Sequence, residues 1–254
     1  RDMALFLDVG QGHEQGSPYW AKPLVRPYIE ELGTAAGRLR IGLVRDSLTG
    51  SPLDPAVAKV LDDTARRLSA MGHNVEELRL NIDPRQLFGA HGSVIGDALL
   101  TLVHDREQAL GRPATADDFE RITQVVLDNG KKVTGEGLYR ARQSFESIGG
   151  YMEQQFDTFD VILSPVTANV TPELGLLSLN QPWDSYAHNA MGSAAFTVLA
   201  NVSGQPALSL PVGMSDNGLP IGMMFTAPLG GEDVLLRLGA QIEQDRPFAK
   251  LPVV

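Results

Sequence analysis

The stretch Leu39-Arg40-Ile41-Gly42-Leu43-Val44 begins the part of the sequence that decides the fold. Apolar and other residues alternate along it, as in a β-strand. Asp54-Pro55 then supplies a helix N-cap followed by proline at the first helical position. Apolar residues continue at helical spacing until Gly72, namely Val57, Val60, Leu61, Ala65, Leu68 and Met71. Residues 73–80 return as a second strand, so the segment predicts two parallel strands joined by a right-handed crossover and an α/β fold.

Helices are predicted before and after this unit in the sequence. Residues 2–9 are expected to form a short helix that ends at Gly10. The pattern from residue 84 to residue 156 predicts three helices, the second beginning at Thr115 and the third near Thr134.

The last third of the sequence is predicted to contribute further strands to the sheet. Residues 160–165 form a short apolar run, typical of a strand buried on both faces. The elements expected after it are a long loop to residue 189, a buried helix at 193–202, an antiparallel hairpin of strands 207–212 and 221–227, and a final helix at 232–244. Residues 1–254 are therefore interpreted as a single α/β region.

The composition narrows the class of protein. The chain has 254 residues, of which 43% are hydrophobic, and it contains no cysteine. The absence of cysteine excludes disulfides and thiolate chemistry. A net charge of −10 argues against a nucleic-acid partner. No apolar run approaches the roughly 20 residues that span a bilayer, and the first residues do not resemble a signal peptide, so we expect a cytoplasmic protein with no membrane partner.

Single residues give little support for catalysis within this sequence. The five histidines show no metal-ligand spacing, so no metal site is predicted. Ser93 lies close to His91 and Asp97, which superficially suits nucleophilic hydrolysis. A nucleophile elbow needs Gly-x-Ser-x-Gly between a strand and a helix, whereas the surroundings of Ser93 are helical. No glycine-rich phosphate-binding motif is present either.

Two stretches near the carboxyl end carry a family resemblance. Asn201-Val202-Ser203-Gly204-Gln205-Pro206-Ala207-Leu208-Ser209-Leu210-Pro211-Val212-Gly213, followed by Gly218-Leu219-Pro220-Ile221-Gly222, resembles the carboxyl-terminal core of the amidase signature family. The remaining elements occur in the family's order along the full chain. The loop Pro18-Tyr19-Trp20 favours the branch related to cyclic-dimer hydrolases that act on nylon oligomers.

The resemblance implies a mixed central sheet flanked by helices and cleavage of small-molecule carboxamides without a cofactor. Family members use a serine, a second serine linked by a cis peptide bond, and a lysine, which lie in a glycine- and serine-rich stretch. Nothing in this sequence matches that stretch, so no catalytic residue is assigned. The resemblance thus implies a carboxyl-terminal part whose partner is the amino-terminal half of the same polypeptide, with a homo-oligomer as a further possibility.

Substrate contacts are expected where family members vary with substrate. These positions are the long helix around Ser93 and the loop through Thr167 and Trp183. Two alternatives remain open: a binding or scaffold domain that lost the signature region, and a self-sufficient serine hydrolase that uses Ser93 and His91. If the chain is the carboxyl-terminal part of such a hydrolase, it should expose apolar surface where the amino-terminal half docks.

Overall fold

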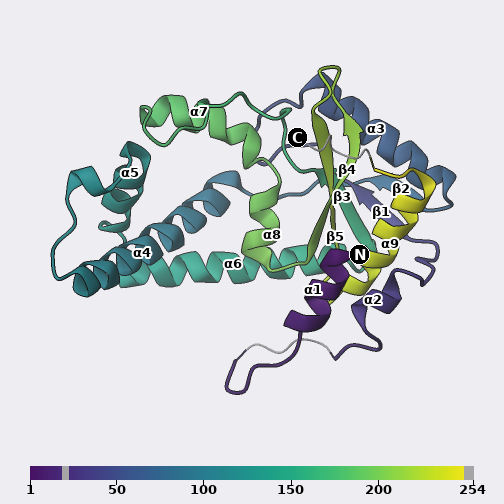
Figure 1. Cartoon of the computed structure of the whole chain (residues 1–254), viewed down its shortest axis with the longest axis horizontal. Coiled ribbons are helices and arrows are strands. Elements are labelled where there is room, and N and C mark those ends of the chain that lie inside the picture. The colour runs from purple at the N-terminus through teal and green to yellow at the C-terminus, as the bar shows by residue number, and fades with distance from the viewer. Residues whose placement is uncertain (19–22, 249–254) are drawn as a thin grey trace.

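The computed structural model describes residues 1–18 and 23–248, so Tyr19 and Trp20 of the loop that favours the cyclic-dimer hydrolase branch lie outside the described residues. Its centre is a mixed five-stranded sheet in the order β2-β1-β3-β5-β4 (Figure 1). The strands are β1 (Arg40–Leu43), β2 (Asn74–Glu77), β3 (Val161–Pro165), β4 (Ala207–Met214) and β5 (Pro220–Thr226). β1 pairs in parallel with β2 and β3, whereas β5 pairs antiparallel with β3 and β4. The α/β prediction is confirmed.

The helices form two groups in Figure 1. On one side lie α1 (Asp2–Gly10), α2 (Tyr28–Glu31), α3 (Pro55–Ala70) and α9 (Glu232–Asp245). On the other lie α4 (Pro84–Leu110), the short 3-10 helix η1 (Ala116–Asp118), α5 (Arg121–Gly130), α6 (Gly135–Gln155), α7 (Trp183–Ser193) and α8 (Thr197–Ser203). We call this second group the helical layer, and we call the sheet together with α3 and α9 the sheet region.

The crossover unit forms as the sequence predicts. The Asp54 carboxylate accepts a hydrogen bond from the Ala56 N–H at 2.8 Å, which caps α3. β1 and β2 are parallel, with Ile41 opposite Val75. The α3 side chains Leu61 and Leu68 are fully buried. The predicted crossover is confirmed, and its helix packs its apolar face on the sheet.

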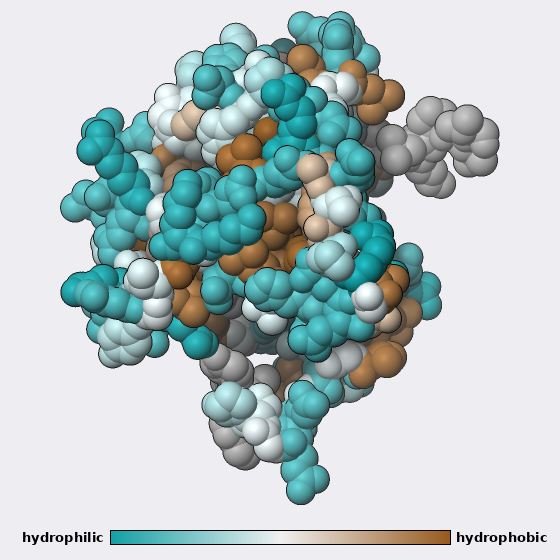
Figure 2. Space-filling view, turned by 90° about the vertical axis from the view of Figure 1, so that its left-hand side faces the viewer, coloured by the Kyte–Doolittle hydropathy of each residue, from teal (hydrophilic) through white to brown (hydrophobic). Residues whose placement is uncertain are grey.

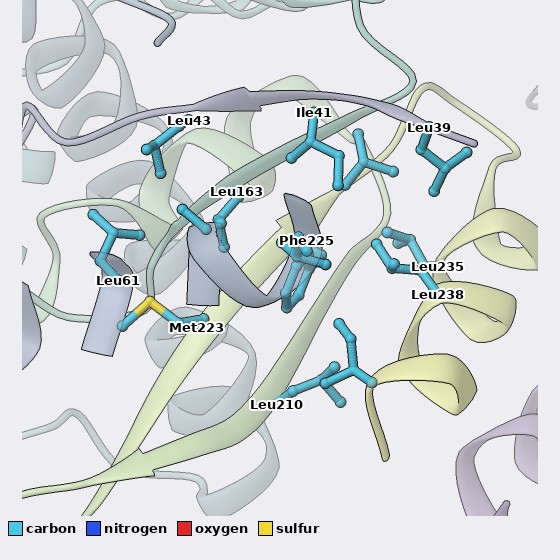
Figure 3. Packing of buried hydrophobic residues seen from close by; sticks show 14 of the residues in the cluster. Leu39, Ile41, Leu43, Leu61, Leu163, Leu210, Met223, Phe225, Leu235 and Leu238 are labelled. Carbon is cyan, nitrogen blue, oxygen red and sulfur yellow. The ribbon is translucent and has the colours of Figure 1, made fainter. Parts of the chain in front are cut away.

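The main hydrophobic core lies between the sheet and the helices α3 and α9. Figure 3 shows Ile41, Leu163 and Phe225 from three strands pointing toward Leu61 of α3 and Leu235 of α9. Successive β3 residues alternate between two cores, because Leu163 belongs to this cluster and Ile162 to the cluster on the opposite face. β3 is therefore buried on both faces, as predicted.

The opposite face of the sheet carries a second core, which joins it to the helical layer. Ile162 of β3 and Met224 of β5 pack there against side chains of α4, α6 and α8, represented by Leu87, Met152 and Leu199. α8 ends at Gly204, whose φ of 81° lies in the left-handed region that glycine adopts without strain. This glycine therefore ends a buried helix shortly before β4 begins.

The start of one helix in the helical layer differs from the prediction. A helix predicted to begin at Thr115 is a single 3-10 turn, and α5 begins only at Arg121. Asp118 accepts hydrogen bonds from the Thr115 N–H at 2.8 Å and from Arg112, and Phe119 is extended. These side-chain bonds hold a compact turn in which the chain leaves the helical conformation.

The predicted loop to residue 189 contains most of α7. This helix begins at Trp183, behind Pro182, and has Asp184 in its first turn. The helix predicted at residues 193–202 is interrupted at Ala194 and restarts as α8. α7 has only one buried residue, Gly192, so it lacks the apolar periodicity that a core helix would show.

α4 is the longest helix and packs against α5 and α6. By length and composition it is the one helix among the described residues that could cross a membrane, a test that core helices of soluble proteins also pass. Its contact with α5 is close, because a Cβ added at Gly96 would lie 2.9 Å from the Gly130 Cα. Two facing glycines therefore set the separation of α4 and α5.

The candidate functional site: a cleft in the helical layer

A cleft of about 630 Å³ opens between α4, α5, α7 and α8. Figure 2 views the molecule from the side of the helical layer and shows hydrophobic surface inside a hollow with a hydrophilic border. Apolar side chains from α4, from α5 and its following turn, and from α8 line it: Phe88, Ile95, Ile122, Val126, Val133 and Val198. No Asp, Glu, Lys or Arg of the described residues contributes to the lining.

Ser93 lines this cleft from α4, as does His91. The Ser93 hydroxyl donates a hydrogen bond to the Gly89 carbonyl at 2.9 Å, so its proton is engaged while its oxygen can still accept. Burial lowers the pKa of His91, which keeps its imidazole neutral near pH 7. Residues two apart on a helix do not face each other. Within the described residues no hydrogen bond joins Ser93 to His91, and the pair thus lacks the geometry of a nucleophile and its base.

Trp183 lines the same cleft from the start of α7. Its ring lies 6.3 Å from that of Tyr186, at an interplanar angle of 44°. The two aromatic residues are one helical turn apart, so both point to one side of α7 and form a wall of the cleft. The Trp183 residue is 44% exposed, which leaves its ring accessible to a ligand.

Thr167 lies in a separate, smaller cleft. That cleft, of about 150 Å³, follows β3 and includes Asn169, Ser193 and Gly222. The Thr167 hydroxyl donates to the Asn169 carbonyl at 2.7 Å. The structure therefore brings Ser93 and Trp183 together and places Thr167 apart, although Ser193 of the small cleft adjoins Ala194 of the large one.

Sequence reasoning missed four polar residues of the large cleft: Asn129, Tyr186, Thr197 and Asn201. Tyr186 follows Trp183 by three residues, and this spacing would have identified it had the helix been recognised. Asn129 is the residue before Gly130 at the end of α5, and only the packing of α5 on α4 brings it to the cleft. Asn201 lies within the stretch that carries the family resemblance, where its helical neighbours suggested a core position.

The described residues show neither a cluster of metal ligands nor a hydrogen-bonded serine–lysine pair. Among residues 1–18 and 23–248, no group of three or more His, Asp or Glu side chains is placed to hold a metal ion. Lys131 and Lys132 donate to Asp128 and Asn129, and Lys59 is exposed. None of these three lysines is hydrogen-bonded to a serine hydroxyl, and Lys22 and Lys250 lie outside the described residues.

Comparison with known sequences gives one consistent result. The family model described as Amidase matches residues 1–236. The 6-aminohexanoate-cyclic-dimer hydrolase of Paenarthrobacter ureafaciens is 32% identical over 98% of this chain and 52% of its own length. A putative amidase of Mycobacterium leprae is 30% identical over all of this chain and 52% of its own length. The chain thus spans about half the length of these curated relatives.

A solved structure agrees in fold. The structure of 6-aminohexanoate cyclic dimer hydrolase superposes with a TM-score of 0.88 at 31% identity, over 97% of this chain and 53% of that one. That hydrolase has also been solved in complex with its substrate. A match of the family model to most of the sequence and a shared fold lead to the same assignment. The chain belongs to the amidase signature family.

Proposed function

We propose that this chain is the carboxyl-terminal part of a hydrolase that cleaves carboxamide C–N bonds. In this proposal the chain supplies a substrate-binding cleft, and the amino-terminal part of the same polypeptide supplies a serine, a cis-linked serine and a lysine. The observation that carries the proposal is the combination of family membership with a match to only about half of each relative.

The chemistry requires groups that the described residues do not bring together. In amide hydrolysis by this route, the serine oxygen adds to the carbonyl carbon, and the C–N bond breaks as the amine leaves with the serine proton. Water then cleaves the acyl-serine ester, which releases the carboxylic acid and returns a proton to the serine. The nucleophile needs an adjacent base and N–H donors for the oxyanion. The Ser93 hydroxyl donates to the Gly89 carbonyl, and within residues 1–18 and 23–248 no hydrogen bond joins it to a base.

The surface of α1 supports a partner segment. Phe6 and Val9 are 75% and 90% exposed, and Met3 and Leu5 on the same short helix are also exposed. On the other side of this helix Ala4 is buried against Tyr28 and Leu236. A helix with apolar side chains on both its inner and outer sides is typical of a helix that is covered on both. We propose that the amino-terminal half covers the outer side.

The test compares the 254-residue chain with the polypeptide in which the preceding sequence of its gene is restored. Each is incubated with aryl and alkyl amides and with a serine-reactive fluorophosphonate probe, and mass spectrometry locates the label. We expect hydrolysis and stoichiometric labelling only in the longer polypeptide, at a serine outside residues 1–254. The Ser93→Ala variant of the longer polypeptide should still be labelled.

The other outcomes favour the two alternatives. Labelling of the 254-residue chain that Ser93→Ala abolishes would show a self-sufficient serine hydrolase. Absence of labelling and of hydrolysis in both proteins would favour a binding or scaffold domain. Because the same probe and amides are used throughout, the three outcomes exclude one another.

A further inference from the structure

The large cleft in the helical layer has no Asp, Glu, Lys or Arg in its lining, and this limits the ligands that it can bind. We propose that this cleft binds an uncharged, mainly apolar part of the amide substrate and discriminates against substrates that carry a carboxylate or an ammonium group there. The inference rests on the proposed function, since it concerns the substrate of the same hydrolase.

Size and lining define the chemical class. A volume of about 630 Å³ lies within the range of small-molecule sites, roughly 300 to 1,000 Å³. Ile95, Val126 and Val198 from three different helices line it, and Trp183 adds an aromatic wall. An aliphatic or aromatic chain would bury apolar surface against all four elements, and this burial favours binding.

The polar side chains of the cleft include no Asp, Glu, Lys or Arg; they are His91, Ser93, Asn129, Trp183, Tyr186, Thr197 and Asn201. The Asn129 side-chain oxygen accepts from Lys132 Nζ at 3.1 Å, so its NH₂ group remains available. The Asn201 NH₂ donates to the Thr197 carbonyl at 3.3 Å, so its oxygen remains available. One donor and one acceptor of this kind suit a neutral amide or hydroxyl group. The Lys132 ammonium itself is exposed and does not line the cleft.

A charged ligand would lose its hydration without gaining a counter-ion. Transfer of an ionised carboxylate or ammonium into an apolar site is costly unless the charge is paired. The lining holds no group of opposite charge for either kind of ion, because His91 is its one titratable residue that can become cationic and burial disfavours its charged form. We therefore expect the same preference against both signs of charge.

The experiment uses three primary amides of matched chain length: hexanamide, 5-aminopentanamide and glutaramic acid, which end in a methyl, an ammonium and a carboxylate. For the longer polypeptide described above, kcat/KM is measured for hydrolysis, and Kd is measured by calorimetry irrespective of turnover. We expect hexanamide to be preferred by about tenfold or more over both charged amides. A charged amide that binds and reacts as well as hexanamide would overturn the inference.

A matched pair of variants ties the preference to this cleft. Ile95 lines the cleft and is 46% exposed, so Ile95→Asp and its neutral isostere Ile95→Asn should both fold. We expect Ile95→Asp to raise the ratio of kcat/KM for 5-aminopentanamide to kcat/KM for hexanamide by about tenfold. Ile95→Asn should leave this ratio nearly unchanged. Val126→Asp with Val126→Asn repeats the comparison from α5. Unchanged ratios in both pairs would show that the cleft does not contact the substrate.

The two proposals fail in distinguishable ways. Hydrolysis and probe labelling without a charge preference would leave the proposed function intact and reject the inference about the cleft. Absence of hydrolysis and labelling would reject the proposed function, and the Kd values would still decide the charge preference. Failure of all three amides to bind at millimolar concentration would reject the cleft as a ligand site.

Discussion

The sheet region and the helical layer differ in how completely they bury their helices. α3 has 16 residues, six of which are buried, whereas α4 has 27 residues and only three buried ones. The sheet region therefore behaves as a close-packed core, in which side-chain volume is fixed on all sides. The helical layer leaves apolar side chains around an open cleft. The comparison indicates that different helices build the close-packed scaffold and the cleft that we propose as the substrate site.

The same contrast holds for ion pairs. Glu31 is 2% exposed and contacts Arg237 at 2.6 Å and Arg26 at 3.2 Å, which ties α2 to α9 on the outer side of the sheet region. In the helical layer, Glu136 and Arg140 form an exposed pair along α6. A buried carboxylate depends on its partners, whereas an exposed pair is solvated with or without them.

The largest expected effect is that of a cavity in the sheet region. Leu68→Ala should lower the free energy of unfolding by about 2 to 5 kcal/mol, because the side chain is fully buried and the close-packed core cannot collapse around the gap. The control is Leu102→Ala in α4, where the side chain is 64% exposed and we expect a change of about 0.5 kcal/mol or less. Urea unfolding of both variants measures the difference. Similar losses for both would refute the contrast between the regions.

Removal of the buried ion pair should have the next largest effect. Arg237→Met leaves the Glu31 carboxylate buried with only Arg26 beside it, and we expect a loss of about 3 kcal/mol in the free energy of unfolding. Arg140→Met is the matched variant in the helical layer and should cost about 0.5 kcal/mol or less. Denaturant unfolding at two salt concentrations checks both values. A small loss for Arg237→Met would mean that water hydrates the Glu31 carboxylate or that the ion pair with Arg26 is sufficient to stabilise it.

A close helix contact tests whether the helical layer has any tightly packed point. Gly96→Ala should destabilise the protein by about 1 to 3 kcal/mol, because its Cβ would lie 2.9 Å from the backbone of Gly130. The control is Gly92→Ala in the same helix, where no atom lies within 4 Å of the added Cβ. There we expect a gain of about 0.5 kcal/mol from the better helix propensity of alanine. In thermal unfolding, Tm should fall for Gly96→Ala and rise for Gly92→Ala. An unchanged Tm for Gly96→Ala would mean that α4 and α5 move apart at little cost.

The smallest expected effect concerns pH. His73 in the sheet region accepts the Leu39 N–H at Nδ1, 3.1 Å away, and its other nitrogen lies 3.1 Å from Gln241 Oε1. Burial lowers the pKa of His73 and, in the helical layer, that of His91. Above the unfolded-state pKa of about 6.5 both states are neutral; as the pH falls through it, the unfolded state takes up the proton first. The free energy of unfolding should therefore fall between pH 7.5 and pH 5.5.

The two histidines should not contribute equally to this loss. Protonation of His73 places a proton at the nitrogen that accepts the Leu39 N–H, whereas His91 has no such bond among the described residues. We therefore expect His73→Gln to flatten the pH dependence more than His91→Gln, as measured by urea unfolding at several pH values. The reverse order would mean that the fold disfavours protonation of His91 in the helical layer more than protonation of His73.

The sheet region was largely predictable because its signals are local and agree with one another. Asp54-Pro55, the helical spacing through Leu68 and the short strand around Ile41 each point to the same crossover. α7 was not predicted because its side chains face the cleft and the surface, so the apolar periodicity of a core helix is missing. The turn at Thr115 was misread because Asp118, a typical first-turn residue of a helix, bonds back to the turn instead.

The sequence by itself determined the fold class and the family, because strand and helix patterns and the Asn201 to Gly213 stretch are written in neighbouring residues. Only the tertiary structure decided which candidate residues lie together. Ser93 and Trp183 share one cleft and Thr167 lies in another, a grouping that depends on how α4 and α7 each pack against α5. The physical reason is that a cleft is formed by side chains from segments far apart in sequence, and their proximity is set by packing contacts such as Gly96 against Gly130.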